Sequence, residues 1–418
     1  MRFIADLHIH SRFSRATSSE MEIPAIARAA RQKGIKLMAT GDFTHPQYFE
    51  SLKKYLKFTD NGLYVYEDTC FIVNTEVNNI YSAGGRLRRI HNMIFVPSLE
   101  SAKAIAEMLG KYGKLEADGR PSLSLSSYEL VARLTEIEPR SFVVPAHIWT
   151  PWFSLYGANS GFDSFEECFG DLSDEVFAVE TGLSSDPPMN WRLSALDKKT
   201  LISNSDAHSP SRLGREANVF NCELDYDEIR QVLKTKDRSK FLFTIEFFPE
   251  EGKYHYDGHR QCGVRLTPAQ SILSGDICPV CGRRLTVGVL HRVEALADRK
   301  PEEVPKDMIP FKHLVPLEEI IAEALGVGRD TAGVSKKYEE MINGLGSEFE
   351  ILMDVPISEI ARFGERIAQG VEAMRKGEVI IEPGYDGVFG VVRVLPDSLR
   401  SQPVAPNAGK GEQLRLFG

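Results

Sequence analysis

The sequence predicts an α/β protein: a βα barrel followed by a small zinc-binding module and a helical C-terminal domain. Strand-like and helix-like segments alternate over the first 220 residues, as in a parallel βα repeat. A cysteine cluster and a local basic excess begin after about residue 247. Amphipathic helical patterns then cover residues 317–376. These observations predict domains at 1–247, 248–300 and 301–394, with a linker and tail at 395–418.

The predicted strands are short, apolar and rich in β-branched or aromatic residues. They are Phe3–His8, Lys36–Asp42, Phe71–Val77, His91–Pro97, Phe142–His147, Val176–Thr181 and Thr200–Ser205. The predicted helices are Ile23–Lys33, Ser98–Gly110, Ser127–Glu136, Leu317–Leu325 and Ile357–Met374. Pro24 near the start of the first helix and Gly34 after its end are typical helix boundaries.

Composition indicates an ordinary globular chain and restricts its location. Of 418 residues, 42% are hydrophobic and 26% charged, and the formal net charge is −9. This charge argues against a surface that is basic throughout, although residues 252–300 carry eight basic and four acidic residues, a local net charge of +4. No apolar run approaches the roughly 20 residues that span a bilayer. The opening MRFIADLHIH does not resemble a signal peptide, so we expect a cytoplasmic protein.

Residues of the types that bind metals lie at the expected strand ends, in DLHIH, TGDFTH, NTEV, PAHIW, VETG and SNSDAH. In a βα barrel these ends converge on one face, so distant residues would meet there. The predicted ligands are His8, His10, Asp42, His45, Glu76, His91, His147, Asp206 and His208. Imidazoles and carboxylates together suit two or three divalent metals, which activate water for phosphodiester hydrolysis. Zinc, manganese or iron fit these ligands, and magnesium could support activity.

The segments DLHIHSRFS, TGDFTH, TEV, HNM, PAHIW and SDAH together resemble the ordered motifs of the PHP (polymerase and histidinol phosphatase) family. The resemblance implies a distorted seven-stranded βα barrel with a trinuclear site. It implies one ligand set of His8, His10, Glu76 and Asp206, a second of Glu76, His91 and His147, and a third completed by His45 and His208.

Two departures from the family pattern affect this assignment. Arg15 stands where the family often has Asp, and TGDFTH replaces the usual T-D-H, which leaves the shares of Asp42 and His45 open. Asp206 and His208 are expected to act in catalysis as well as in binding. Arg15 could contact the scissile phosphate or be a solvated or carboxylate-paired arginine. Glu180 could serve as a ligand or orient a ligand histidine.

The six cysteines fall into two groups. Cys70, Cys168 and Cys222 are scattered and are predicted to be ordinary thiols. His259, Cys262, Cys278 and Cys281 form two pairs with the spacing of a structural zinc site, and His255 could replace His259.

A PHP barrel joined to such a zinc module, with GYDGVFGVV at 384–392, resembles the endonuclease Q family over nearly the whole chain. The resemblance implies a DNA repair endonuclease that cuts 5′ of hypoxanthine, uracil, xanthine or an abasic site. Its partner would be double- or single-stranded DNA containing a lesion. Two alternatives are a PHP small-molecule phosphatase and a non-catalytic, clamp-associated DNA-binding protein.

Two further segments carry specific expectations. Trp149, Trp152, Phe153 and Tyr156 lie beside a predicted ligand and could line a pocket for an extruded base or wedge the duplex, although ordinary loop packing would also explain them. The terminal peptide QLRLF follows residues rich in Pro, Ser, Gly and Asn, which predict a flexible linker. Its residues Gln413, Leu414, Leu416 and Phe417 resemble a motif that docks on the replication sliding clamp, whereas a frayed terminus would be the simpler explanation.

Overall fold

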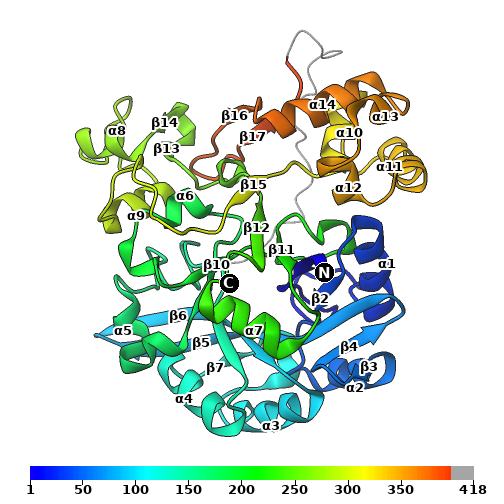
Figure 1. Ribbon diagram of the computed structural model, residues 1–418. Helices are drawn as coiled ribbons and strands as arrows, with labels where there is room; N and C mark the ends of the chain where they lie inside the picture. The colour runs from blue at the N-terminus through cyan, green and yellow to red at the C-terminus, as the bar shows by residue number, and fades with distance from the viewer. Residues whose placement is uncertain (397–418) are drawn as a thin grey trace.

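The computed structural model describes residues 1–396. A central sheet carries helices on its outer side. Two smaller parts, formed by the chain after residue 250, lie beside each other above this sheet in the view of Figure 1. The first 246 residues contain β1 (Arg2–Asp6), α1 (Ile23–Lys33), β2 (Leu37–Ala39), α2 (Pro46–Tyr55), β3 (Lys57–Thr59), β4 (Leu63–Tyr66), β5 (Thr69–Ala83), β6 (Arg86–Val96), α3 (Leu99–Leu109), β7 (Ser122–Leu123), α4 (Ser127–Ile137), β8 (Phe142–Pro145), α5 (Phe165–Phe169), β9 (Ala178–Glu180), α6 (Pro187–Asn190), β10 (Thr200–Ile202), β11 (Ala217–Asn221), α7 (Tyr226–Thr235) and β12 (Phe241–Glu246).

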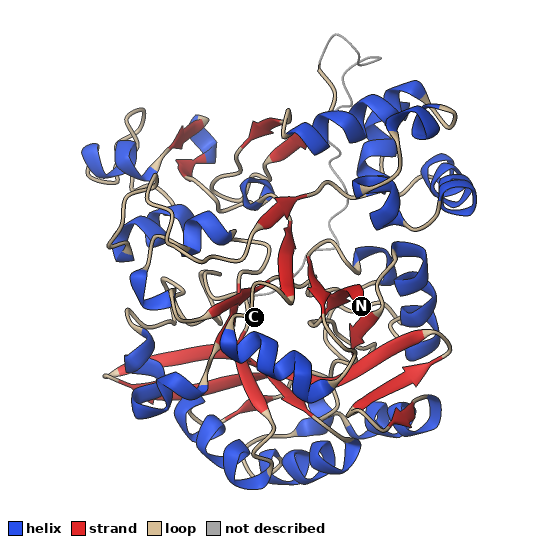
Figure 2. Ribbon diagram, in the orientation of Figure 1, coloured by secondary structure: helices blue, strands red, loops and turns tan. Residues whose placement is uncertain are grey.

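The remaining elements form the two smaller parts. The predicted zinc module contains β13 (Asp257–His259), β14 (Val264–Leu266), α8 (Pro268–Leu273) and α9 (Val289–Leu296). The C-terminal part contains β15 (Phe311–His313), α10 (Leu317–Leu325), α11 (Ala332–Leu345), α12 (Glu348–Met353), α13 (Ile357–Ala361), α14 (Glu365–Lys376), β16 (Ile380–Glu382) and β17 (Val391–Arg393). Figure 2 shows that helices dominate the C-terminal part, as the sequence predicts.

The fold is α/β, but its sheet is mixed where the sequence predicts a parallel one. The main path runs β15-β12-β11-β1-β2-β5-β4-β3, and β6 joins β5 to β8. Strands β1, β2 and β5 pair in parallel, whereas β11 pairs antiparallel with β1, and β6 antiparallel with both β5 and β8. The prediction of an all-parallel repeat is therefore wrong for the β5–β6 and β6–β8 pairs. A tight turn at Gly84–Gly85 joins β5 to β6 directly as an antiparallel hairpin.

Continuous strand pairing does not close the central sheet into a ring within residues 1–396. Strands β9 and β10 pair in parallel with each other as a separate two-stranded sheet. Two local contacts bridge the remaining gaps: the amide of Ile148 donates to the carbonyl of Glu180, and Ile9 forms an isolated bridge with Ala207. These contacts bring the segments after β1, β8, β9 and β10 to one end of the sheet.

Local sequence explains the helix boundaries around the sheet. Helix α1 begins with Pro24 in its first turn and ends at Gly34, whose φ of 85° is the left-handed conformation that glycine adopts readily. Helix α4 starts at a capping box in which Ser126 and Glu129 exchange hydrogen bonds. The predicted helix Ile357–Met374 is two helices, α13 and α14, because the chain breaks at Gly364, a residue that disfavours helix.

The smaller parts are integrated with the central sheet. Strand β15 pairs in parallel with β12, and the β16–β17 hairpin reaches the zinc module through a bridge between Tyr256 and Tyr385. A continuous cluster of buried apolar side chains extends from Phe3 to Leu395. Among residues 1–396, none of the helices combines the length and the apolar character needed to cross a bilayer.

Candidate metal centre

Seven of the nine predicted ligands meet in three overlapping groups. The groups are His8, His10 and Glu76; Glu76, His91 and His147; and His10, Asp206 and His208. Within each group the potential ligand atoms all lie within 4.8 Å of one another. Glu76 and His10 each belong to two groups, so the three groups form one continuous centre.

The sheet positions these side chains in different ways. His8 and His10 follow β1, His147 follows β8, and Asp206 and His208 follow β10. Glu76 and His91 lie within the long strands β5 and β6, not at strand ends as predicted. His91 pairs with Asn78, two residues along β5 from Glu76, so both side chains are on the same face of the hairpin.

The shared carboxylate of Glu76 lies at the middle of the centre. Its Oε1 lies 2.8 Å from Nδ1 of His91 and 3.3 Å from Nε2 of His147. Its Oε2 lies 3.2 Å from Nε2 of His10 and 3.6 Å from Nε2 of His8. One carboxylate thus faces two imidazole pairs, which is the geometry of a bridging ligand.

Asp206 provides the second carboxylate. Its Oδ1 lies 3.1 Å from Nε2 of His10 and 3.7 Å from Nδ1 of His208. The Asp206 side chain is 21% exposed, whereas the side chains of Glu76, His8 and His10 are at most 1% exposed. The centre therefore opens to solvent beside Asp206. Asp206 and His147 both have left-handed backbone angles, with φ of 46° and 32°, which cost energy in residues other than glycine.

The donor atoms fit bound cations. The buried side-chain atoms that make no hydrogen bond within the described chain include four from this centre: Nε2 of His8, Nε2 of His10, Oε1 of Glu76 and Oδ1 of Asp206. Leaving such atoms unpaired is costly, and all four point into the same cluster. Metal ions would satisfy them, and His8, His10, Glu76, His91, His147, Asp206 and His208 are the residues that would hold these ions.

Electrostatics within the centre also favour cations. Burial alone would raise the pKa of Glu76 and Asp206, but the neighbouring histidines, and Arg120 in the case of Glu76, hold both values well below the usual range. Burial lowers the pKa of His91 to about 3 and that of His208 to about 4, which keeps both imidazoles neutral, as metal ligands must be. Burial alone would lower the pKa of His8 and His10, but nearby carboxylates, above all Glu180 for His8 and Asp42 for His10, raise both well above the usual value. Metal binding at these two rings would therefore displace protons.

Glu180 orients two of the histidines. Its carboxylate lies 3.0 Å from Nδ1 of His8 and accepts the backbone amide of His147 at 2.8 Å. The amide of Asn204 donates to the same carboxylate at 2.8 Å. Because Nδ1 of His8 is held by Glu180, Nε2 is turned toward Glu76 and Asp206. Of the two roles left open by the sequence, the geometry favours the orienting one.

Asp42 is predicted as a ligand, but the structure places it behind His10. Its carboxylate lies 3.1 Å from Nδ1 of His10 and accepts the amide and hydroxyl of Ser11 and the hydroxyl of Ser14. These donors occupy its oxygens, and Asp42 joins none of the ligand groups found in residues 1–396. Gly41, the glycine of TGDFTH, has φ of 67° and packs closely on the segment after β1: a Cβ there would meet the carbonyl oxygen of Ile9 at 2.5 Å.

His45 and Arg15 are likewise not brought into the ligand groups. His45 stacks on Phe13 with ring centroids 4.3 Å apart, and it stands at the start of α2. Its Nδ1 is buried and without a hydrogen bond among the described atoms. Arg15 is exposed, and its backbone amide donates to Asp118.

Sequence reasoning missed Arg120. Its Nη1 lies 3.1 Å from Oε2 of Glu76, and its side chain is 14% exposed. The residue comes from the loop between α3 and β7, where no strand end or histidine pattern marks it. The sequence offered only the Gly-Arg pair in that loop, a weak signal.

The aromatic segment after His147 divides into two pairs. Trp149 and Tyr156 are 1% and 0% exposed, and their rings lie tilted against each other with centroids 5.0 Å apart, so neither can receive a base without rearrangement. In this conformation both rings are packed inside the protein, which favours the ordinary loop packing that the sequence left open for them. Phe153 is half-buried, has φ of 61°, and lies 4.9 Å from the His91 ring. The guanidinium of Arg89 lies over the rings of both Trp152 and Phe153.

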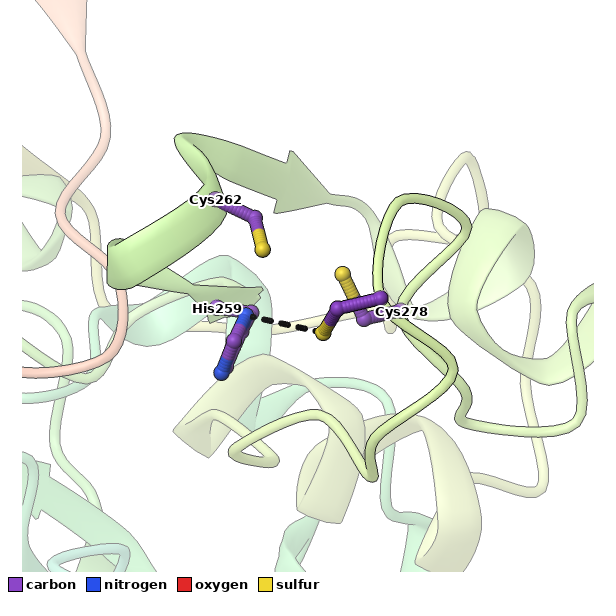
Figure 3. Close-up of side chains that lie close together, drawn as sticks. His259, Cys262 and Cys278 are labelled. Carbon is purple, nitrogen blue, oxygen red and sulfur yellow. Dashed lines mark hydrogen bonds between the residues drawn. The ribbon is translucent and has the colours of Figure 1, made fainter.

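The predicted zinc ligands His259, Cys262, Cys278 and Cys281 form one group within 4.8 Å. Figure 3 shows the labelled side chains of this group turned toward one another, and Sγ of Cys281 lies 3.5 Å from Nδ1 of His259. Backbone bonds from Cys278 to Arg283 and from Gly282 to Cys278 close the turn that carries both cysteines. His255, the alternative ligand, is buried, with 5% of its surface exposed, and lies outside this group. The group fits a tetrahedral zinc ion.

The predicted clamp-binding residues Gln413, Leu414, Leu416 and Phe417 lie outside the described residues. The predicted linker also lies outside them from residue 397 onward. Leu395, at the predicted start of the linker, is 1% exposed, and its amide donates to Glu323.

Comparison with known proteins identifies the family. A solved structure described as the lesion-specific endonuclease PfuEndoQ from Pyrococcus furiosus is 34% identical, with a TM-score of 0.86. The match covers 97% of this chain and 98% of that one. This chain belongs to the endonuclease Q family. A structure of endonuclease Q with a 27-mer duplex containing an abasic lesion also matches, with 34% identity, a TM-score of 0.84 and coverage of 97% and 99%.

Two sequence relatives and one domain match accompany this endonuclease Q fold. An uncharacterized protein of Methanocaldococcus jannaschii, MJ0043, is 36% identical over 258 residues, 60% of this chain. The chain spans 32% of the length of that relative. The Bacillus subtilis protein YqxK is 28% identical over 415 residues, 94% of this chain and 99% of that protein. Residues 316–378, which contain α10–α14, match the family described as the MJ0043 C-terminal domain.

Proposed function

We propose that this chain is a metal-dependent DNA repair endonuclease that cleaves the phosphodiester 5′ of a deaminated base or an abasic site. The observation that carries the proposal is the full-length likeness to endonuclease Q, at 34% identity and a TM-score of 0.86, in a chain with a buried His and carboxylate centre. A related structure holds duplex DNA with an abasic lesion at its active site, which supports DNA as the substrate class.

Two or three divalent metals in this centre would lower the pKa of a bound water and neutralise charge on the phosphoryl oxygens. The chain's own residues hold and shape this site. Glu76 faces two imidazole pairs, and Glu180 and Asp42 fix the rings of His8 and His10 from outside. Asp206 and His208 stand at its partly exposed side, where a phosphodiester would enter.

Lesion selection would involve the Trp152–Phe153 turn. This turn borders His91, and its half-exposed rings lie next to a cationic side chain, Arg89. Aromatic faces beside an arginine suit stacking on an unpaired base, whichever base it is. Hypoxanthine, uracil and xanthine are the deaminated bases that we propose as substrates, together with abasic sites.

The remaining parts have supporting roles in this proposal. A structural zinc ion at His259, Cys262, Cys278 and Cys281 would hold a module whose local charge is positive and could lie on the DNA backbone. The terminal QLRLF would dock on a sliding clamp. Strands β1, β2, β5, β6, β8, β9 and β10 would act together as a distorted barrel, supported by the Ile148–Glu180 and Ile9–Ala207 contacts.

The test is strand cleavage of duplexes carrying one uracil, hypoxanthine or abasic site, with an undamaged duplex beside them. Wild-type protein should nick just 5′ of the lesion, and Asp206→Asn should not. Asp60→Asn, which changes an exposed carboxylate outside the ligand groups, is the matched control and should cleave normally. Release of phosphate from small monoesters without nicking would support the phosphatase alternative. Specific binding without either reaction would support the non-catalytic one.

A further inference from the structure

Arg120 is a cation built into the metal centre without being a ligand. Its Nη1 lies 3.1 Å from Oε2 of Glu76, the oxygen that also faces His8 and His10. Burial lowers the pKa of Arg120, but the carboxylates of Glu76 and Asp206 outweigh this and raise it, so the guanidinium keeps its charge. The centre therefore has a permanent positive group, the guanidinium of Arg120, in contact with its shared carboxylate, Glu76.

The loop that carries Arg120 is held in place from several sides. The amides of Arg120 and Arg15 both donate to Oδ1 of Asp118, at 3.1 and 3.3 Å. The amide of Gly119 donates to the carbonyl of Phe13 at 3.0 Å, and its carbonyl accepts the hydroxyl of Thr44 at 3.4 Å. These bonds fasten the loop to the segments that follow β1 and β2.

Gly119 allows the loop to approach this closely. A Cβ at this position would lie 2.3 Å from Oδ2 of Asp42 and 2.4 Å from Oγ of Ser14. Both atoms belong to the network that orients His10, so no side chain can be accommodated without disturbing it. The missing side chain thus brings the next residue, Arg120, against the centre.

Arg215 provides a useful contrast within the same centre. Its Nε donates to the carbonyl of Ser205 at 2.8 Å and its Nη2 to the carbonyl of Asp206 at 3.4 Å. Its guanidinium therefore shapes the loop that carries Asp206. Arg120 instead donates from its guanidinium group to Glu76, a carboxylate that bound metal ions would share.

We propose that Arg120 donates hydrogen bonds to a non-bridging oxygen of the scissile phosphodiester and stabilises the charge that develops there during hydrolysis. This inference rests on the proposed function, since it assumes a phosphodiester at the centre. Bound cations would neutralise Glu76, and the planar guanidinium of Arg120, with its five N–H donors, would then be available to an anion at the same place. A preorganised donor of this kind contributes most where charge accumulates in the transition state.

The test compares Arg120→Ala and Arg120→Lys with wild type on two substrates, bis(4-nitrophenyl) phosphate and an abasic-site duplex. Both variants should keep the wild-type metal content, measured by inductively coupled plasma mass spectrometry. We expect kcat to fall about 10²–10³-fold in Arg120→Ala, the loss typical of removing one charge-stabilising donor, with a smaller change in KM. Added guanidinium ion, below denaturing concentration, should restore part of the Arg120→Ala rate. Lys114→Gln, an exposed cation on the same loop, is the matched control.

Two outcomes would overturn the inference. One is wild-type kcat for Arg120→Ala on both substrates at full metal content. The other is a loss of rate that follows a loss of metal and is not rescued by guanidinium, since Arg120 would then only position Glu76. If wild type hydrolyses the small diester in an Arg120-dependent way but leaves lesion DNA intact, the proposed function fails and the role of Arg120 stands.

Discussion

Nζ of Lys33 lies 2.8 Å from Oε2 of Glu348, and this buried ion pair joins helix α1 to helix α12 across 315 residues of sequence. The side chains are 9% and 5% exposed. Glu348 also accepts the hydroxyl of Tyr338 and the amide of Leu317, so one carboxylate links α1 to α10 and α11 as well. The C-terminal helices are therefore attached to the catalytic part through a buried ion pair.

Lys33→Met should destabilise the protein by about 3–5 kcal/mol, the cost of leaving one member of a buried ion pair without its partner. Urea denaturation of wild type and Lys33→Met measures the difference in their free energies of unfolding. The double variant Lys33→Met/Glu348→Gln should recover part of the loss because it removes the uncompensated charge. Equal stability of wild type and Lys33→Met would show that the pair does not hold the two parts together.

The same pair should make stability depend on pH. Burial raises the pKa of Glu348, but Lys33 and three hydrogen bonds outweigh it and hold the pKa below the ordinary 4.5. A carboxyl group whose pKa is depressed by folding adds stability above the unfolded value, and that stability is lost as pH falls through the folded value. Below about pH 4.5 the wild type should therefore lose stability faster than Glu348→Gln. Parallel pH profiles of their unfolding free energies would contradict this.

Glu180→Gln should weaken metal binding without removing a ligand. The amide can no longer hold Nδ1 of His8 as a charged acceptor, and losing such a partner typically costs 10–100-fold in metal affinity. Competition with a chelator, followed by metal analysis, measures the change. Glu175→Gln, an exposed carboxylate a few residues earlier, should bind like wild type. If Glu180→Gln bound metal with wild-type affinity, Glu180 would have no role in metal binding.

Cys281→Ser should lower the zinc content by one ion per chain and destabilise the module around α8 and α9. The thiolate group supplies one of four ligands, and a structural zinc site supplies folding energy. Metal analysis and proteolysis within residues 252–300 report the two effects. Cys70→Ser, in strand β5 and outside the cluster, should keep full zinc. An unchanged zinc content in Cys281→Ser would exclude the proposed zinc site at this cysteine cluster.

Phe153→Ala should reduce nicking at base lesions more than at abasic sites, because an abasic site offers no base to stack. Loss of stacking on one aromatic face costs about 1–3 kcal/mol, or roughly 5- to 150-fold in affinity. Nicking rates on matched uracil and abasic duplexes give the ratio. Phe58→Ala, an exposed ring on β3, is the control. An equal loss on both substrates would indicate a general packing role near His91.

Much of the site was predictable because metal ligands are restricted to a few residue types. The motifs containing His8, His10, Glu76 and Asp206 identified the centre, and the spacing of Cys278 and Cys281 identified the zinc group. Helices with clear boundary residues, such as Ile23–Lys33, were predicted to the residue. The sequence left the roles of Asp42, Trp149 and Tyr156 open, because these roles depend on what surrounds each side chain, and sequence position does not report that.

The sequence by itself therefore determined the α/β class, the ligand types and the order of the parts, since these follow from local periodicity and residue chemistry. Only the tertiary structure decided that β5 and β6 form a long hairpin that carries Glu76 beside His91. It alone brought Arg120 to Glu76 over 44 positions and Lys33 to Glu348 over 315. Such pairings depend on how distant segments pack, and the free energy that selects them comes from contacts absent in any local stretch of chain.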